Sequence, residues 1–300
     1  GSFIAGMAQL RYMYAMPVER IVKLFNDNGF DMDKGTAHGL LRKTERLFEN
    51  LYHVLGDAIK EDTYLAGDET YHRVLVDTKN KNGKGIKKAY VWVVTAVNTG
   101  LVYYFYHDGS RREDIILDYI KGYRGAFQSD GFSPYRKMAK WLLRLACFQH
   151  VKRKFLDCGD DFDTKVIVRL ANYIYHQDHK HIIGVDGWTE RDHYKWRQQY
   201  ALPVMRIIRK KLERMAADKS LLPKTEKYDA VHYMLNEWDG LMNIFTRGDY
   251  HLDNNLVERL NRYISLSRRN SLFFGSHTGV RRTAMFYSLA CSCRLQGVNF

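Results

Sequence analysis

The stretch that decides the fold covers residues 251–276 and reads HLDNNLVERLNRYISLSRRNSLFFGS. Its residues 253–255, Asp-Asn-Asn, predict a helix start, because short polar side chains accept hydrogen bonds from the first unpaired backbone N–H groups of a helix. Four apolar residues then recur at helical spacing and predict the stripe that anchors this helix: Leu256, Leu260, Tyr263 and Ile264. Glu258 lies off that stripe, so the pattern predicts a carboxylate held on a rigid element and directed away from the anchoring side chains.

Glu258 and Arg262 are four residues apart, and two interpretations of them stay open. This spacing is typical of an ordinary ion pair on the exposed surface of a helix. The alternative is that Glu258 belongs to a functional site, which requires further acidic residues from elsewhere in the chain.

Strand patterns occupy the region between residues 64 and 150. The run at 90–97 (YVWVVTAV) is β-branched, aromatic and apolar on both faces, as in a central strand. A turn at 98–100 and a second run at 101–106 predict a hairpin. The other predicted elements are a strand at 64–67, a polar basic loop at 78–88, a helix at 112–123, a strand at 126–129 and a strand at 142–148.

Two aspartates follow predicted strands, Asp68 after the first and Asp130 after the fourth. An aspartate at a strand end is commonly a turn or cap residue, and this interpretation applies to each of them alone. If the two strands are neighbours, the carboxylates meet. Together with Glu258 they make the acidic set of a ribonuclease-H-like fold, an α/β fold with a mixed sheet.

Helical periodicity fills the remaining parts of the chain. Near the N-terminus, Asp33 is predicted to cap the second of two helices that Asn28-Gly29 separates; the pair is either a DNA-binding helix-turn-helix or a brace for the next domain. After residue 150, helices are predicted at 163–175, 189–200, 204–215 and 225–245, with breaks at Pro203 and Pro223. The predicted organisation is an N-terminal helical segment (1–60), a first core part (61–150), a large helical insertion (151–250) and last core helices (251–300).

The formal charge of +13 indicates a polyanionic partner, with nucleic acid favoured over a membrane surface. No apolar run is long enough to span a bilayer and no secretory signal opens the chain. Four cysteines without the density of a disulfide scaffold indicate reduced thiols in a cytoplasmic protein. The basic residues expected to contact DNA phosphate are Arg259, Arg262, Arg268, Arg269, Lys152 and Arg153; structural roles for some of the arginines stay open.

Three converging carboxylates in a basic protein predict a divalent metal site. Hard oxygen ligands suit Mg²⁺ or Mn²⁺, and two such ions about 4 Å apart support in-line displacement at a phosphodiester. The residues predicted to support the ligands are Glu69, His150 and Asn254. A zinc site from Cys147, His150, Cys291 and Cys293 is disfavoured by poor local spacing, and a Cys147–His150 nucleophile pair lacks a third member.

Several segments resemble the DDE transposases of the bacterial insertion-sequence sixty-six family, in family order from about residue 7 to the C-terminus. The matching segments are Asp68-Glu69-Thr70; 122–125 (GYRG) with 128–131 (QSDG); 147–155 (CFQHVKRKF); 222–225 (LPKT); 253–255 (DNN) with Glu258, Arg259 and Arg262; 268–276; and 288–297. The sequence departs from the family at Arg269, usually lysine, and at Ser271, usually tryptophan; neither is an expected metal ligand.

The resemblance implies that Asp68, Asp130 and Glu258 are the DDE triad and that a helical insertion precedes the helix bearing Glu258. It also implies metal-dependent cleavage and strand transfer at insertion-sequence ends, with double-stranded element ends and target DNA as substrates. Small accessory proteins of the same element and homo-oligomers on DNA are the implied partners. The alternative from another class is a non-catalytic DNA-binding protein descended from a transposase.

Overall fold

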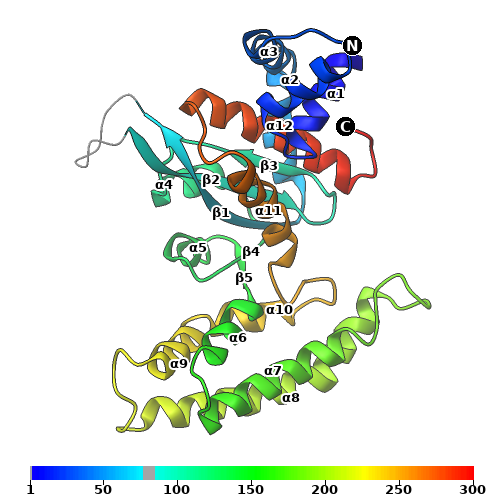
Figure 1. Cartoon of the computed structure of the whole chain (residues 1–300). Helices are drawn as coiled ribbons and strands as arrows, with labels where there is room; N and C mark the ends of the chain where they lie inside the picture. Colours follow the sequence, from blue (N-terminus) through cyan, green and yellow to red (C-terminus); the bar gives the residue numbers. More distant parts are fainter. Residues whose placement is uncertain (1, 77–84) are drawn as a thin grey trace. The chain divides into compact units, whose positions relative to one another are not determined.

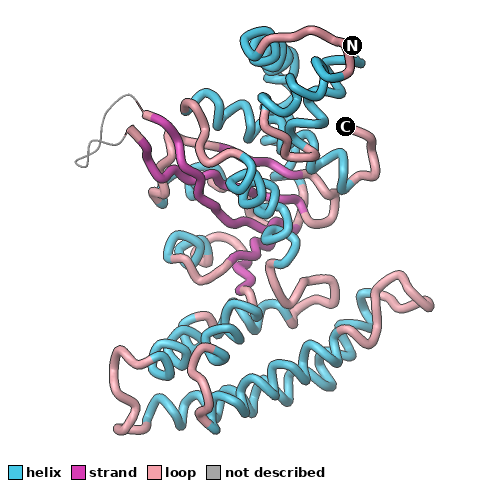
Figure 2. Tube along the Cα trace, viewed as in Figure 1, coloured by secondary structure: helices cyan, strands magenta, loops and turns pink. Residues whose placement is uncertain are grey.

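The computed structural model describes residues 2–76 and 85–300, which form two compact units. The first unit contains residues 1–125 and 255–300, and the second contains residues 126–254. Figures 1 and 2 show the helices and strands of each unit. Of the predicted polar loop at 78–88, residues 78–84 lie outside the described residues, and Ile86 already begins a strand.

The first unit has an antiparallel sheet of three strands in the order β3-β2-β1. These are β1 (Tyr64–Leu75), β2 (Ile86–Ala96) and β3 (Val102–Phe105). The hairpin predicted from the apolar runs is confirmed, with Gly100 at a φ of +69° in its turn. The predicted end of the first strand at residue 67 was wrong, because β1 pairs with β2 as far as Leu75 and so carries Asp68 within the strand.

Two C-terminal helices pack against this sheet: α11 (Asn255–Asn270) lies on β1 and β2, and α12 (His277–Leu295) lies on β3 and β1 (Figure 1). The helix start predicted at 253–255 is confirmed. Buried apolar residues of α11, α12 and the sheet form one core with the N-terminal helices. The burial of this apolar surface is the main stabilising contribution to the unit.

The N-terminal helices are α1 (Ser2–Tyr12), α2 (Val18–Asp27) and α3 (Lys34–Ala58), followed by a short 3₁₀ turn, η1 (Ile59–Glu61). Asp33 caps α3 as predicted, since its Oδ1 accepts a hydrogen bond from the Thr36 backbone N–H at 2.9 Å. Helices α1 and α3 pack against α12, so these helices brace the sheet domain. Whether they also bind DNA stays a prediction. Among the described residues of this unit, the other helix outside the C-terminal pair is α4 (Glu113–Tyr119).

The second unit begins with a parallel pair, β4 (Ala126–Ser129) and β5 (Leu143–Ala146), connected through α5 (Ser133–Met138). An antiparallel meander, a helix and then a parallel pair is the succession of strands expected for a ribonuclease-H-like mixed fold. The predicted α/β class is confirmed. The rest of this unit is α6 (Phe148–Leu156), α7 (Phe162–Asp178), α8 (Glu190–Ala217), α9 (Glu226–Asn236) and α10 (Trp238–Ile244).

Three predictions for the second unit were wrong in detail. The strand predicted at 142–148 ends at Ala146, so that His150 lies on α6. Pro203 does not break the chain but lies inside α8, where buried contacts on both sides, including Ala201 and Met205, outweigh the one missing backbone hydrogen bond. The helix predicted at 225–245 is two helices that meet at Glu237.

The predicted helical insertion, residues 151–250, lies inside the second unit, which also includes β4 and β5. Its definition as a separate domain stays a prediction. In this unit α7 and α8 run side by side as its longest helices (Figure 1). Within residues 2–76 and 85–300, the helices are too short or too polar to cross a bilayer.

Burial of His72 on β1 gives the first unit a specific pH dependence. The side chain is 1% exposed, its ring centroid lies 4.2 Å from that of Phe274, and its Nδ1 donates to the Arg73 carbonyl at 3.0 Å. Desolvation lowers the pKa of His72 from 6.5 to about 4, because the charged ring is poorly solvated there. Between these values the unfolded chain binds more protons than the folded chain, so the free energy of unfolding falls as the pH is lowered from about 6.5 to 4.

We expect His72 to lower the free energy of unfolding by on the order of 3 kcal/mol over this pH range, since one pKa unit corresponds to about 1.4 kcal/mol. Urea unfolding at pH 7 and pH 4 measures the decrease. His72→Gln removes the titration, so its unfolding free energy should depend less on pH than that of the wild type. The exposed His53→Gln is the matched control on the same unit. Equal pH dependence in the His72 variant and the wild type would contradict the prediction.

Candidate active site

Asp68 lies on the side of β1 that faces α11. Side chains alternate along a strand, so Ala66, Asp68, His72 and Val74 point to the same side. Ala66 and Val74 belong to the core that also contains buried residues of α11. The row beneath the helix therefore carries one partly buried carboxylate, Asp68, between the apolar Ala66 and the buried His72 and Val74.

The carboxylate of Asp68 is held by hydrogen bonds at both oxygens. Asn261 of α11 donates from Nδ2 to Oδ2 at 2.7 Å, and the backbone N–H of Glu69 donates to Oδ1 at 2.8 Å. Asn261 is 8% exposed, and its own Oδ1 is buried without a hydrogen-bond partner among the described residues. An oxygen acceptor next to a fixed carboxylate is therefore available to a further group, such as a cation or its bound water.

Glu258 precedes Asn261 by three residues on α11, and residues at this spacing share a helix face. The predicted anchoring stripe was partly wrong: Val257, Leu260, Asn261 and Ile264 are buried, whereas Leu256 is only half-buried. Glu258 therefore flanks the buried face and is half-buried itself, rather than directed away from it. The contact of Asn261 with Asp68 brings the Glu258 turn of α11 to the Asp68 region of β1.

Asp130 belongs to the second unit and directly follows β4. Its Oδ1 accepts the backbone N–H of Phe132 at 3.0 Å, which closes a tight turn. Its backbone carbonyl accepts a hydrogen bond from Arg144 Nη2 at 2.9 Å. The next residue, Gly131, donates its N–H to the Tyr233 hydroxyl at 3.0 Å. The Asp130 turn is therefore fixed by the helical part of the same unit.

A buried ion-pair network supports this turn, and no local sequence signal indicated it. Arg144 is 4% exposed and Glu237 is 1% exposed. Arg144 Nη2 donates to Glu237 Oε2, and Arg136 Nε donates to Glu237 Oε1 at 2.7 Å. Glu237 lies at the junction of α9 and α10, 93 residues after Arg144, so only the folded chain reveals the pair.

The three residues predicted to support the acids lie in different surroundings. Glu69 points to the side of β1 opposite Asp68 and accepts a hydrogen bond from Arg111 Nε at 2.8 Å. Asn254 is buried in the second unit, where its backbone N–H donates to Cys147 Sγ at 3.3 Å. His150 is half-buried on α6. Their supporting roles stay predictions.

Two of the four cysteines fit the interpretation as buried structural thiols, whereas Cys293 is only half-buried. All four are free, and Cys147 and Cys291 are buried. Burial raises the pKa of Cys291 to about 12, so this thiol stays protonated at neutral pH and is a poor metal ligand.

The predicted DNA-contacting residues divide into exposed and stacked side chains. Arg259, Arg262 and Arg269 are exposed on α11, and Arg153 is exposed on α6. The Arg268 guanidinium lies 4.4 Å from the Tyr71 ring centroid, and Lys152 Nζ lies 4.6 Å from that of Tyr175. Partial burial lowers the pKa of Lys152. Cation–π contacts give these last two basic groups a structural role as well.

Comparison with known proteins shows the family of this chain. A family model described as "Transposase IS66 family" matches residues 1–282. The chain is 26% identical over 309 residues to the uncharacterized protein y4jD of Sinorhizobium fredii (strain NBRC 101917 / NGR234), which covers 96% of the chain and 58% of that protein. It is 24% identical over 316 residues to the uncharacterized protein y4qI of the same strain, covering 99% and 56%. The chain thus spans little more than half the length of these relatives.

A solved structure similar to this chain is that of the Drosophila P element transposase strand transfer complex. The TM-score is 0.49 and the sequence identity 11%, with 96% of this chain and 91% of that chain covered.

Proposed function

The chain belongs to the IS66 transposase family, and from this premise we propose that it is the catalytic part of a DDE transposase. It cleaves phosphodiester bonds at the ends of an insertion sequence and joins the ends to target DNA. The observation that carries this proposal is the hydrogen bond between Asn261 and Asp68, because it brings the helix bearing Glu258 to the strand bearing Asp68. Both acids match the motifs on which the family resemblance rests.

Asp68, Asp130 and Glu258 are the proposed ligands of Mg²⁺ or Mn²⁺. The donor set fits such ions, since it consists of carboxylate oxygens, and the free Asn261 Oδ1 lies on the side chain that contacts Asp68. Two bound ions would activate the attacking oxygen and stabilise the leaving oxygen. The chain's own residues hold and orient the ligand carboxylates. Asn261 and the Glu69 N–H fix the Asp68 carboxylate, and hydrogen bonds from Arg144 and to Tyr233 fix the Asp130 turn.

The proposed substrates are double-stranded element ends and target DNA. Arg259, Arg262, Arg268, Arg269, Lys152 and Arg153 neutralise phosphates, so binding should weaken steeply with salt. Homo-oligomers on paired ends and small accessory proteins of the same element are the proposed partners. The formal charge of +13 supports a polyanionic substrate.

The direct test incubates the protein with DNA that carries the element ends and with Mg²⁺ or Mn²⁺. Strand cleavage followed by joining to target DNA is the expected result. Cleavage without joining indicates a general nuclease instead. If DNA binds but is not cleaved, the protein is a DNA-binding descendant of a transposase and the enzyme proposal fails.

Asn261 should set the affinity of the proposed metal site. Groups that orient metal ligands typically contribute 10- to 100-fold in metal affinity. Asn261→Leu removes the hydrogen bond to Asp68 and keeps the side chain's approximate size, so we expect Mn²⁺ to bind about tenfold more weakly by calorimetry. Asn26→Leu, which removes side-chain hydrogen bonds with the Met32 backbone elsewhere in the first unit, is the control. Unchanged Mn²⁺ affinity in the Asn261 variant would rule out the orienting role.

A further inference from the structure

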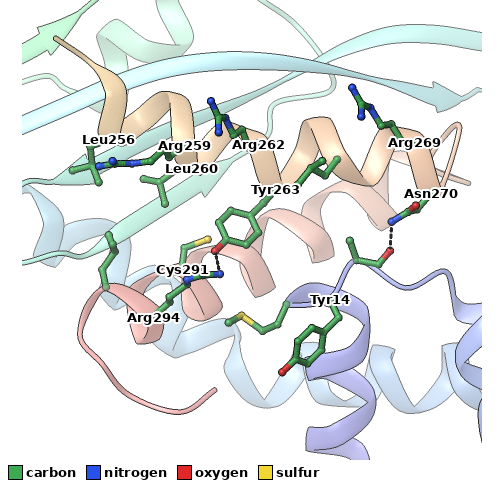
Figure 3. A pocket seen from close by; sticks show the side chains of 14 residues that line it. Tyr14, Leu256, Arg259, Leu260, Arg262, Tyr263, Arg269, Asn270, Cys291 and Arg294 are labelled. Carbon is green, nitrogen blue, oxygen red and sulfur yellow. Dashed lines mark hydrogen bonds between the residues drawn. The ribbon is translucent and has the colours of Figure 1, made fainter.

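A pocket of about 660 Å³ opens between α11, α12 and the turn after α1, entirely within the first unit (Figure 3). This volume is within the range of small-molecule sites, about 300–1,000 Å³. Two hydrogen bonds connect the elements that line the pocket. Asn270 Nδ2 at the end of α11 donates to the Ala15 carbonyl at 3.0 Å, and Arg294 Nη1 of α12 donates to the Tyr263 hydroxyl at 2.5 Å.

The pocket is strongly cationic. Four arginines contribute to its lining, Arg259, Arg262 and Arg269 from α11 and Arg294 from α12, and no aspartate or glutamate does. Within residues 2–76 and 85–300, none of the four forms an ion pair with a carboxylate. Arg294 points to the Tyr263 side of α11, whereas the Arg262 and Arg269 guanidinium groups lie on its other side, at the rim of the pocket (Figure 3). Positive charges without internal compensation in the pocket and along its rim attract an anion.

The pocket also presents aromatic and apolar surface that the fold leaves uncovered. Tyr14 is 65% exposed and Leu266 is 50% exposed, although both lie against the pocket. Tyr263 points toward Arg294 across the space between α11 and α12 (Figure 3). An anionic ligand with a flat apolar part matches both properties of this surface.

The pocket lies on a different flank of α11 from Glu258 and from Asn261, which contacts Asp68. At 100° per residue, Leu256 and Tyr263 fall on one flank, and Glu258 and Asn261 fall on the other. The exposed ridge between the two flanks carries Arg262 and Arg269. A chain of phosphates that crosses this ridge would therefore connect the acidic flank with the pocket.

We propose that this pocket binds an unpaired nucleotide of a DNA strand, an inference that rests on the proposed function. The phosphates lie against the arginines, and the base packs on Tyr14, Tyr263 and Leu266. A positively charged groove with aromatic side chains is the general design of single-strand binding, because every base offers a flat face. Duplex DNA cannot use the pocket in this way, since its base faces are covered by stacking. An acidic peptide would satisfy the arginines but leave the tyrosine surface unused.

The test compares binding of a fluorescent 12-nucleotide dT strand with binding of a duplex of the same length, at one salt concentration and without divalent metal. Tyr14→Ala changes an exposed ring and should not disturb folding. We expect it to weaken single-strand binding about tenfold, the scale of one stacked base, and duplex binding less than twofold. Tyr14→Phe should retain wild-type affinity. Tyr173→Ala, at a 40% exposed tyrosine of α7, is the matched control and should change neither.

Arg294→Gln provides a second variant and should also weaken single-strand binding more than duplex binding. If both variants lose equal affinity for single-stranded and duplex DNA, the proposal is overturned. Such a result would mean that the pocket residues contact only DNA phosphates. Polyglutamate can also be tested as a competitor of the fluorescent strand, at the same charge concentration as unlabelled dT. If it displaces the strand as effectively as dT does, the proposal is overturned in favour of an acidic peptide. If the protein cleaves element ends but the variants bind the dT strand normally, this inference fails alone. If cleavage is absent but the single-strand loss is found, the proposed function fails and the nucleotide pocket stands.

Discussion

Asp130→Asn is expected to lower the rate of DNA strand cleavage at least about 1,000-fold while leaving DNA affinity within about twofold. Loss of a charged metal ligand removes several kcal/mol of transition-state stabilisation, and about 4 kcal/mol corresponds to a factor of 1,000. The variant should fold normally, because the amide oxygen of asparagine can accept the same Phe132 N–H that Asp130 Oδ1 accepts now. The change in cleavage rate therefore reports the contribution of the negative charge of Asp130.

Single-turnover cleavage of element-end DNA with Mn²⁺ measures the rate, and fluorescence anisotropy measures the affinity. Asp160→Asn is the matched control, since this aspartate of the same unit has a 98% exposed side chain and pairs only with Lys165 among the described residues. Asp68→Asn and Glu258→Gln should behave like Asp130→Asn. Cleavage that persists in one of the three variants would remove that acid from the proposed triad.

Glu237→Ala should destabilise the second unit by about 3–5 kcal/mol, the usual cost of removing one partner of a buried ion pair. The reason is that Arg144, 4% exposed, would keep its charge in a buried site after losing the carboxylate it pairs with. Urea unfolding followed by circular dichroism measures the change. Arg144 also donates to the Asp130 carbonyl, so the same variant should slow cleavage.

The comparison for this effect is Glu213→Ala, which breaks the exposed pair between Arg209 and Glu213 on α8. An exposed pair of this kind contributes about 0.3–0.5 kcal/mol. If Glu237→Ala lowers the free energy of unfolding no more than Glu213→Ala does, burial of the network contributes nothing to stability.

Features that depend on neighbours in sequence were predictable. The start of α11, the Asp33 cap, the strand at residues 126–129 and the β2–β3 turn follow from short polar caps, β-branched runs and turn residues. These signals act over a few residues, so the sequence displays them directly.

Features that depend on distant partners were not predictable. Asn261 and Asp68 are 193 residues apart, and Arg144 and Glu237 are 93 apart, so no local pattern pairs them. Pro203 was misjudged for the same reason, because the packing that keeps α8 continuous comes from other helices. Likewise β1 extends past Asp68 because β2 offers partners as far as Leu75.

The alternation of side chains along β1 restricts which insertions and deletions the chain can accept. Asp68 faces Asn261, while the next residue, Glu69, faces Arg111 on the other side of the strand. Loss of one residue between Tyr64 and Asp68 would shift the register and exchange the two faces, so Glu69 would lie beneath α11 and Asp68 beside Arg111. Loss of two residues would restore the faces. Related chains should therefore vary in length ahead of this aspartate by even numbers of strand residues, and single-residue changes should be confined to the loops.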